Sequence, residues 1–207
     1  MMVRSNVMKE KVALRLIIFL CWIIPLTASA YESELPPAMQ SSMPPPNLKA
    51  VSWVLMNPDT GVMIAAENPD EKMEPASLSK LLTAYIIFRE IRRGNLSPEE
   101  EVVISETAWR TGGSRMFIEP GERISVENLL LGMIVQSGND AAVALAEHVA
   151  GSEESFSGLL NQVAAELGLR NSHFVNSTGW PHPDHFSSAR DISQITSAII
   201  REFPDMY

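Results

Sequence analysis

The stretch SLSKLLTAYIIFREIRRG, residues 77–94, decides how the rest of the chain is arranged. Its apolar residues recur at the spacing of a helix, and Gly94 is typical of the position just after a helix ends. We therefore expect a helix over 77–93. Ser77 and Lys80 lie in its first turn, three residues apart, so their side chains share one face and can touch.

The segment before this helix has the pattern of a β-hairpin. Two runs of β-forming residues, 50–56 (AVSWVLM) and 62–66 (VMIAA), flank the turn-forming cluster NPDTG at 57–61. We therefore expect a hairpin that leads directly into the helix carrying Ser77.

The sequence beyond 94 is mainly helical. Ser125 and Ser152 each precede an apolar run and are expected to cap a helix, and a last helix is expected over 189–202. The run 140–149 (DAAVALAEHV) is rich in small residues, which favours a helix packed close to its neighbours. Two short β-type pieces interrupt the helices, at 102–104 and 173–175. A hairpin followed by a helical layer is an α+β arrangement.

Composition and charge narrow the kind of protein. The chain has 207 residues, of which 45% are hydrophobic and 20% are charged, and this composition is sufficient for one globular core. Its net charge of −9 argues against nucleic-acid binding, because that binding draws most of its non-specific affinity from basic residues. We expect no nucleic-acid partner.

The first thirty residues have the pattern of a secretory signal peptide. Basic residues at 4, 9, 11 and 15 precede an uncharged run, and the small residues TASA at 27–30 end in the Ala-x-Ala pattern that signal peptidases cleave. An uncleaved membrane anchor is the alternative, but the uncharged run over 16–30 is short for a spanning helix of about 20 residues. Cys21, the single cysteine, lies inside this leader, so the chain beyond it can form no disulfide.

We expect the chain to divide into three parts. Residues 1–30 form the signal peptide. Residues 31–47 form a proline-rich linker, which holds five of the 14 prolines and has no apolar period. Residues 48–207 form the folded part. Removal of the leader takes away four basic residues and one acid, so the exported protein is more acidic than the whole chain.

The residues SLSK at 77–80 combine a hydroxyl and an amine that can act together. A lysine serves as base to a serine nucleophile when burial holds its amine partly neutral. Lys80 is the only one of the five lysines with a serine three residues before it. Taken alone, however, these four residues are explained more simply by a surface lysine beside a helix cap.

The tripeptide Ser137-Gly138-Asn139 changes that interpretation. It lies between two apolar helical runs, where three small polar residues would be costly to bury without partners or a function. An SxxK sequence followed by SxN is two thirds of the motif set of penicillin-binding proteins and class A β-lactamases. The two motifs together are much more specific than either one.

Beyond these motifs, the sequence resembles the serine-type D-alanyl-D-alanine carboxypeptidases, the low-molecular-mass penicillin-binding proteins of peptidase family S11. The resemblance covers nearly all of 48–207 and is carried by five stretches: 53–68 (WVLMNPDTGVMIAAEN), 75–86 (PASLSKLLTAYI), 112–122 (GGSRMFIEPGE), 129–152 (LLLGMIVQSGNDAAVALAEHVAGS) and 167–191 (LGLRNSHFVNSTGWPHPDHFSSARD). It implies the transpeptidase-like (β-lactamase-like) fold of penicillin-binding proteins, an antiparallel sheet flanked by helices. Residues 48–207 would be the N-terminal part of that catalytic domain.

The resemblance implies a role for four residues at matching positions. Ser77 corresponds to the acylated nucleophile and Lys80 to its general base. Ser137 corresponds to the group that relays a proton to the leaving amine, and Asn139 to a contact with a substrate amide. The resemblance implies neither a metal nor an organic cofactor.

The third motif of the family, Lys-Thr-Gly, does not occur in these 207 residues. In the family it lies downstream on a central strand, where it binds the substrate carboxylate and supplies an oxyanion-hole amide. None of the five lysines is followed by Thr-Gly. Arg110-Thr111-Gly112 precedes Ser137 and belongs to another loop of the family, so we do not expect it to substitute. We expect an incomplete domain, a hairpin and a helical subdomain truncated before the later sheet strands.

Two other polar clusters are expected to be ordinary surface features. The residues HPDH at 182–185 could suggest a metal site, but their prolines and turn favour a solvated loop, and no HExxH pair occurs. Glu153 and Glu154 are expected to be solvated charges at the start of a helix. We expect no metal.

The expected function is removal of the terminal D-alanine from peptidoglycan stem peptides that end in D-Ala-D-Ala, with β-lactams as covalent inhibitors. The protein would be exported in a bacterium, to the periplasm or the outer face of the cytoplasmic membrane, without a membrane anchor once the signal peptide is cleaved. Two alternatives stay open. One is a catalytically inactive truncated fragment or pseudoenzyme. The other is a class A-like β-lactamase, although Gly138 occupies the position where that group has Asp.

Overall fold

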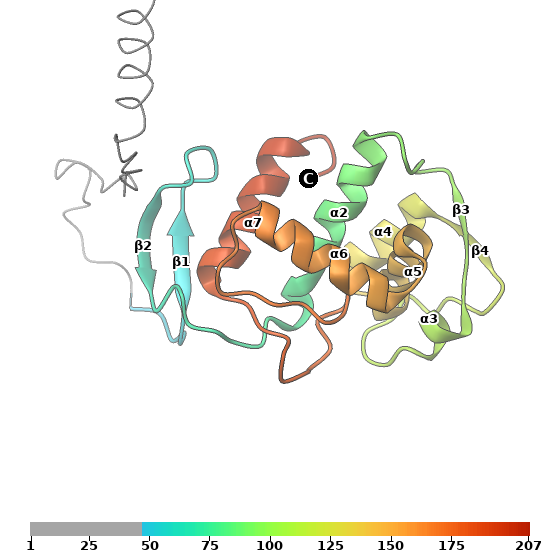
Figure 1. The fold of residues 1–207 in the computed structure, drawn as a ribbon, viewed down its shortest axis with the longest axis horizontal. Coiled ribbons are helices and arrows are strands. Elements are labelled where there is room, and N and C mark those ends of the chain that lie inside the picture. The colour runs from blue at the N-terminus through green and yellow to red at the C-terminus, as the bar shows by residue number, and fades with distance from the viewer. Residues whose placement is uncertain (1–46) are drawn as a thin grey trace, which may run out of the picture. The chain divides into compact units, whose positions relative to one another are not determined.

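A central helix, α2 (Lys80–Arg92), organises the part of the chain that the structure describes. The structure is a computed structural model, and it describes residues 47–207. Leu82, Ile86 and Ile87 on α2 have no exposed surface. Four further helices pack against α2 (Figure 1): α4 (Val126–Val135), α5 (Asn139–Ala150), α6 (Glu153–Glu166) and α7 (Ala189–Glu202). The predicted signal peptide and nearly all of the predicted linker lie outside the described residues.

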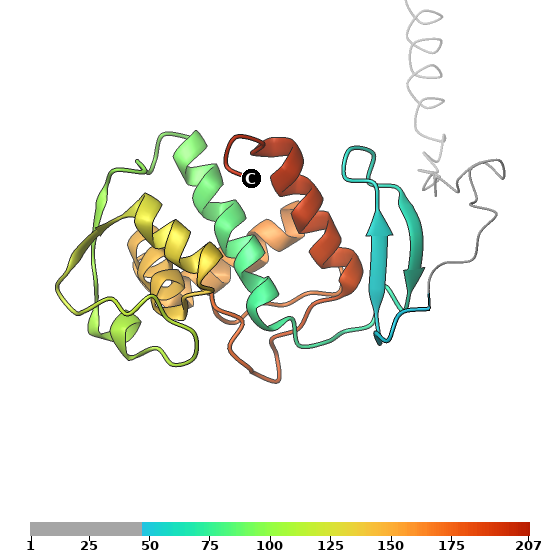
Figure 2. The same ribbon diagram turned by 180° about the vertical axis from the view of Figure 1, so that it is seen from behind.

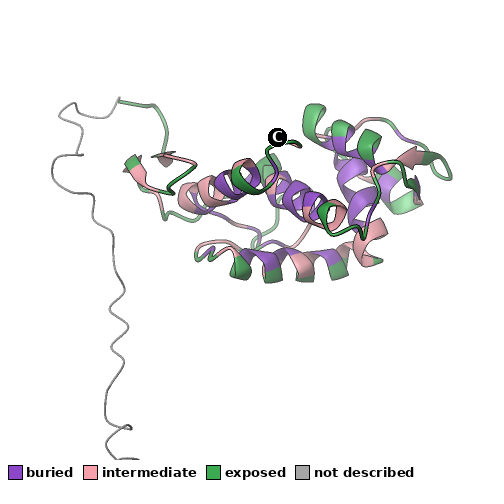
Figure 3. Ribbon diagram, turned by 90° about the horizontal axis from the view of Figure 1, so that it is seen from above, coloured by how far each residue is buried: buried purple, intermediate pink, exposed green. Residues whose placement is uncertain are grey.

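Apolar side chains on the inner faces of these helices form one core. Phe156 of α6, Met133 of α4 and Leu145 of α5 are almost fully buried. Figure 3 shows the same division, with buried residues on the inward helix faces and exposed residues on the outer faces. Seen from behind (Figure 2), α2 and α7 lie side by side, and α7 separates α2 from the hairpin.

The predicted hairpin is present. β1 (Trp53–Met56) pairs antiparallel with β2 (Met63–Glu67), with a register irregularity between Leu55 and Met56. Asn57 shapes the turn, because its Oδ1 accepts hydrogen bonds from the backbone N–H groups of Asp59 and Thr60. Gly61 follows at a φ of +70°, a conformation that favours glycine.

The predicted helix caps are also confirmed. The hydroxyl of Ser125 accepts a hydrogen bond from the backbone N–H of Asn128 at the start of α4. The hydroxyl of Ser152 accepts one from Ser155 at the start of α6. These bonds satisfy backbone donors that have no partner within the helix. The last helix, α7, has the predicted bounds and is capped in the same way by Ser188.

The helix predicted over 77–93 has the right extent, but its first turn is different. Residues Ala76–Ser79 form a 3-10 helix, η2, and the α-helix begins only at Lys80. Ala76 has a φ of +46°, which an alanine seldom adopts, and this conformation gives the chain its sharp entry into the helix. Gly94, at a φ of +73°, follows the end of the helix as predicted.

The short β-type pieces were predicted less well. β3 (Glu101–Val103) is present and pairs antiparallel with β4 (Arg123–Ser125), a strand that the sequence pattern did not indicate. A short helix between them, α3 (Glu106–Arg110), was also missed. The strand expected at 173–175 is wrong, because His173 makes only an isolated bridge to Phe186. Runs of three residues are too short to carry a period, so their partners decide their structure.

The described residues therefore form an α+β arrangement with two separate two-stranded sheets and a helical layer. Each sheet lies toward one end of the helical layer in Figure 1. Within residues 47–207, no helix combines the length and the apolar character needed to cross a membrane.

Candidate active site

A serine and a lysine meet at the start of the central helix. The Nζ atom of Lys80 lies 3.3 Å from the Oγ atom of Ser77, because side chains three residues apart share one face of a tight helical turn. Ser77 is exposed, whereas Lys80 is only 6% exposed. A reagent can therefore reach the hydroxyl while the amine is shielded from bulk water.

Burial poises the amine of Lys80 for proton transfer. It lowers the pKa of Lys80 from its ordinary value to about 8, because the charged form loses its hydration. The two groups closest to Nζ are the Oδ1 atom of Asn139, at 2.7 Å, and the backbone carbonyl oxygen of Thr178, at 2.8 Å. Both are uncharged. The amine of Lys80 is therefore deprotonated more readily than that of an exposed lysine.

The same contacts orient the lone pair of the neutral amine. A neutral amine has two hydrogens and one lone pair, and Asn139 and Thr178 each accept one hydrogen. The remaining direction is toward Ser77, whose hydroxyl is the third neighbour. Lys80 can therefore accept the proton of Ser77 without first breaking a hydrogen bond.

Asn139 is itself held in place from its other end. It begins α5, is 7% exposed, and its Nδ2 atom donates to the carbonyl oxygen of Gly112 at 2.8 Å. The neighbouring Gly113 has a φ of +83°, and a Cβ atom there would lie 2.7 Å from Nδ2 of Asn139. Only glycine fits this position. The backbone carbonyl of Gly112 thus supports Asn139, a contact that the sequence motifs did not indicate.

Ser137 lines a cavity that Ser77 and Lys80 also line. The cavity has a volume of about 300 Å³ and is lined by Ser77, Lys80 and Ser137, with apolar side chains from α2, α4 and α7. Ser137 has a φ of +55° in the turn between α4 and α5. Its buried Oγ has no hydrogen-bond partner among residues 47–207. A buried hydroxyl without a partner is uncommon in folded proteins and points to a function for Ser137.

A loop between α6 and α7 completes the site. The sequence pattern did not predict that this loop contributes to it. Asn176 organises this loop, because its Oδ1 accepts hydrogen bonds from the backbone N–H groups of Thr178, Gly179 and Trp180. This leaves the carbonyl of Thr178 facing Lys80. The sequence NSTG offered one weak signal, since Asn and Gly at this spacing are typical of a shaped turn.

Gly179 brings this loop into direct contact with the turn that carries Ser77. Its φ is +82°, and a Cβ atom at this position would lie 1.7 Å from the carbonyl oxygen of Ala76. The backbones of the two segments therefore touch, and no side chain fits between them.

Two polar clusters expected at the surface are partly buried. In the cluster at 182–185, His182 and Asp184 are exposed as predicted, but His185 is only 2% exposed. Its imidazole lies against Ser79 rather than in a solvated loop. Glu153 is half-buried, so its expected solvation is wrong: its carboxylate accepts hydrogen bonds from the N–H and hydroxyl of Ser177, and burial raises its pKa.

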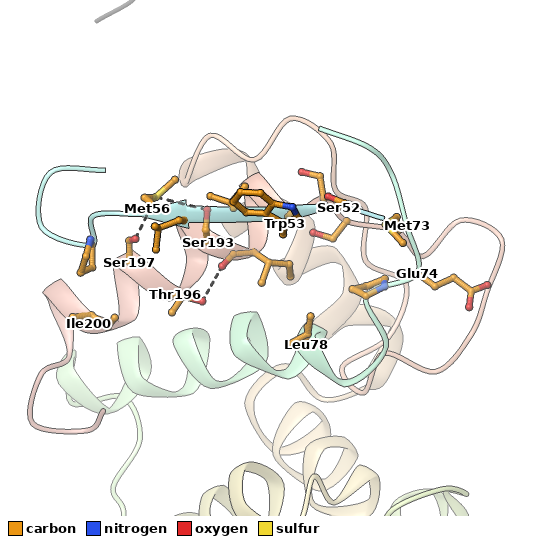
Figure 4. A pocket seen from close by; sticks show the side chains of 18 residues that line it. Ser52, Trp53, Met56, Met73, Glu74, Leu78, Ser193, Thr196, Ser197 and Ile200 are labelled. Carbon is orange, nitrogen blue, oxygen red and sulfur yellow. Dashed lines mark hydrogen bonds between the residues drawn. The ribbon is translucent and has the colours of Figure 1, made fainter. Parts of the chain in front are cut away.

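A larger cavity, of about 660 Å³, lies between β1 and α7 (Figure 4). Trp53 of β1 and Ile200 of α7 lie along it, and the hydroxyls of Ser193 and Ser197 contact the sulfur of Met56. Its lining is mainly apolar and contains no lysine or histidine beside a serine. The serine–lysine pair lies in the smaller cavity at Ser77 and not in this one.

Changing Asn139 to aspartate tests how strongly the amine depends on uncharged neighbours. The variant Asn139→Asp is expected to raise the pKa of Lys80 by about 1 to 3, because a carboxylate next to Nζ favours the charged amine. An NMR titration of the lysine side-chain signals measures this pKa. The control is Asn128→Asp, on the exposed first turn of α4. An unchanged pKa in Asn139→Asp would contradict the contact between Lys80 and Asn139.

Solved structures with the same fold define the class. The chain aligns with penicillin-binding protein 5 of Haemophilus influenzae at a TM-score of 0.77 and 38% identity, over 79% of this chain and 48% of that one. It aligns with the D-alanyl-D-alanine carboxypeptidase DacD of Francisella tularensis at a TM-score of 0.76 and 42% identity, over 78% of this chain and 39% of that one. The described fold is therefore part of the penicillin-binding transpeptidase fold.

A sequence model described as D-alanyl-D-alanine carboxypeptidase, peptidase S11, matches residues 39–207. The chain belongs to this family. It is 40% identical over 176 residues to the D-alanyl-D-alanine carboxypeptidase DacC of Escherichia coli, covering 82% of this chain and 44% of that protein. The chain spans about half the length of the curated relatives it matches.

Proposed function

We propose that the chain carries the acylating centre of a serine-type D-Ala-D-Ala carboxypeptidase, which removes the terminal D-alanine of peptidoglycan stem peptides through an acyl-enzyme on Ser77. The observation that carries this proposal is the hydroxyl of the exposed residue Ser77 lying 3.3 Å from the amine of the buried Lys80. The relatives named as carboxypeptidases support the substrate class. The leader-like sequence at 1–30 supports action outside the cytoplasm.

In the proposed first step, neutral Lys80 takes the hydroxyl proton of Ser77, and Oγ attacks the carbonyl carbon of the penultimate D-alanine. Ser137 lines the same cavity, and its unpartnered hydroxyl would pass a proton to the nitrogen of the departing D-alanine. Water then hydrolyses the ester and restores Ser77. β-Lactams would acylate the same oxygen.

Asn139 would contact the substrate amide in this scheme. Both polar ends of its side chain already have partners, Lys80 at Oδ1 and Gly112 at Nδ2. A substrate N–H can therefore share the second lone pair of Oδ1 while the side chain stays in place. This gives Asn139 two tasks, binding the substrate and orienting the base.

A polypeptide of residues 1–207 alone is expected to react slowly. Family members use a Lys-Thr-Gly motif to hold the substrate carboxylate and one side of the oxyanion, and no such motif occurs here. Loss of one oxyanion-hole donor typically slows a reaction by about 100 to 1,000-fold. For such a polypeptide, the alternative proposal is a fragment or pseudoenzyme that folds but is not acylated.

Labelling with a fluorescent penicillin tests these proposals. A stable adduct is expected on the folded chain, and Ser77→Ala is expected to remove it completely. The control variant Ser97→Ala, on an exposed loop serine outside the cavity, should label normally. Rapid turnover of the label would indicate a β-lactamase instead. No adduct on a chain shown to be folded by circular dichroism would support the inactive fragment.

A further inference from the structure

A buried histidine is hydrogen-bonded to the turn that carries Ser77. The Nε2 atom of His185 lies 2.7 Å from the Oγ atom of Ser79, and that hydroxyl donates to the carbonyl oxygen of Ala76 at 2.9 Å. His185 and Ser79 are 2% and 1% exposed. The three residues therefore form a connected chain that ends at the residue directly before Ser77.

The direction of each hydrogen bond in this chain follows from its donors. Ser79 has one hydroxyl hydrogen, and the carbonyl of Ala76 takes it. Nε2 of His185 must therefore carry a hydrogen and donate it to Ser79. On the other side of the ring, Nδ1 accepts from the backbone N–H of Val175 at 3.3 Å. The ring is neutral, with its single hydrogen on Nε2.

The surroundings keep the ring in this neutral form. Burial, assisted by the nearby histidines His173 and His182, lowers the pKa of His185 to about 4. A proton added to Nδ1 would also face the N–H of Val175, so the charged ring would lose that hydrogen bond. The ring of Phe174 covers one side at 5.5 Å, edge to face. At neutral pH, the ring of His185 therefore stays neutral and keeps the hydrogen on Nε2 that it donates to Ser79.

The carbonyl of Ala76, at the end of this series of hydrogen bonds, lies in an unfavourable backbone conformation that needs support. Ala76 has a φ of +46°, which residues other than glycine seldom adopt. Contact with Gly179 limits the carbonyl on one side, and the hydroxyl of Ser79 binds it from within the turn. If this carbonyl rotates, the peptide that joins Ala76 to Ser77 rotates with it, and the Oγ of Ser77 moves relative to Lys80.

We propose that His185 is a positioning residue for the nucleophile: through the hydroxyl of Ser79 it fixes the Ala76 carbonyl, and so holds Ser77 in front of Lys80. The role in acylation rests on the proposed function above. The effect of His185 on the geometry of the turn does not depend on the proposed function, and it can be measured in a chain that is never acylated.

Two substitutions separate the two hydrogen bonds of the ring. His185→Gln places an amide nitrogen near the Nε2 position and keeps the donor to Ser79. His185→Asn reaches only as far as Nδ1 and keeps the contact to Val175 but not the donor. Positioning predicts that penicillin acylation of His185→Gln stays close to that of the unmodified chain, whereas His185→Asn and Ser79→Ala lose about 100-fold, the effect of a small misplacement of reacting atoms. His182→Gln, at the exposed histidine of the same loop, is the control.

Rates are compared at a temperature where circular dichroism shows every variant to be folded. If the acylation rates of His185→Gln and His185→Asn fall equally, and these losses follow the losses in thermal stability, His185 has only a packing role and the proposal is overturned. If His185→Asn does not fold, Ser79→Ala decides the question, because it removes the same link from the other side.

NMR keeps the test independent of acylation. A long-range proton–nitrogen spectrum is expected to show His185 neutral, with its hydrogen on Nε2, and the amide signals of Ala76 and Ser77 should shift in His185→Asn but not in His185→Gln. If the unmodified chain takes no penicillin but these shifts occur, the proposed function fails and the positioning of the turn holds. A hydrogen on Nδ1, or unshifted amides in His185→Asn, would contradict the inference.

Discussion

Replacing Lys80 by arginine is expected to slow the acylation of Ser77 by about 100 to 10,000-fold, the usual contribution of a general base. Arginine keeps a positive charge and a long side chain at this position, but its pKa lies far too high for a neutral form to exist. The variant therefore removes the base and retains the cation. The second-order rate constant for a fluorescent penicillin measures the effect.

The pH dependence of the same rate identifies the base. Burial lowers the pKa of Lys80 to about 8, and only the neutral amine can accept the proton of Ser77. The rate is therefore expected to rise with pH, about tenfold per pH unit, until it levels off near pH 8. Lys80→Arg should show no such rise. If the acylation rate of Lys80→Arg still rises with pH, with its midpoint at the same pH, another group titrates and the role of Lys80 is contradicted.

Gly179→Ala is expected to destabilise the folded chain by about 3 kcal/mol or more, which is at the upper end of single substitutions. A Cβ atom at this position would lie 1.7 Å from the carbonyl oxygen of Ala76. Two backbone segments would have to separate to admit it, and the φ of +82° is unfavourable for alanine as well. Urea denaturation gives the free energy of unfolding.

Gly61→Ala is the matched control for this substitution. Gly61 also has a positive φ, +70°, but a Cβ atom there meets no other atom within 4 Å. It isolates the backbone cost, which is about 1 to 2 kcal/mol. The difference between the two variants therefore measures the contact between Gly179 and Ala76. Equal free energies of unfolding would show that this contact contributes nothing.

Local patterns in the sequence predicted the longer helices and the contact between Ser77 and Lys80. The capping residues Ser125 and Ser152 predicted where α4 and α6 begin. The spacing of three residues placed the hydroxyl of Ser77 and the amine of Lys80 on one face of the helix. These features depend on neighbours within a turn of helix, so a short window contains all the information needed. The hairpin was predicted for the same reason, from the turn residues that connect its strands.

Long-range contacts could not be predicted in this way. The carbonyl of Thr178 contributes to the site through its backbone, and no residue type encodes a backbone carbonyl. His185 was assigned to a solvated loop because prolines and a turn favour one, but the packing of the loop against η2 and Phe174 buries it. β4 was missed because three residues carry no period without their partner strand.

The neighbours of Lys80 also set the order in which the site can form during folding. The hydrogen bonds that define it join residues separated by 59 positions for Lys80 and Asn139, and by 98 for Lys80 and Thr178. The bond between Ser79 and His185 spans 106 positions. Closing such long loops is entropically costly and slow compared with winding a helix. The surroundings of the Lys80 amine are therefore complete only once α5 and the loop between α6 and α7 have both docked against α2.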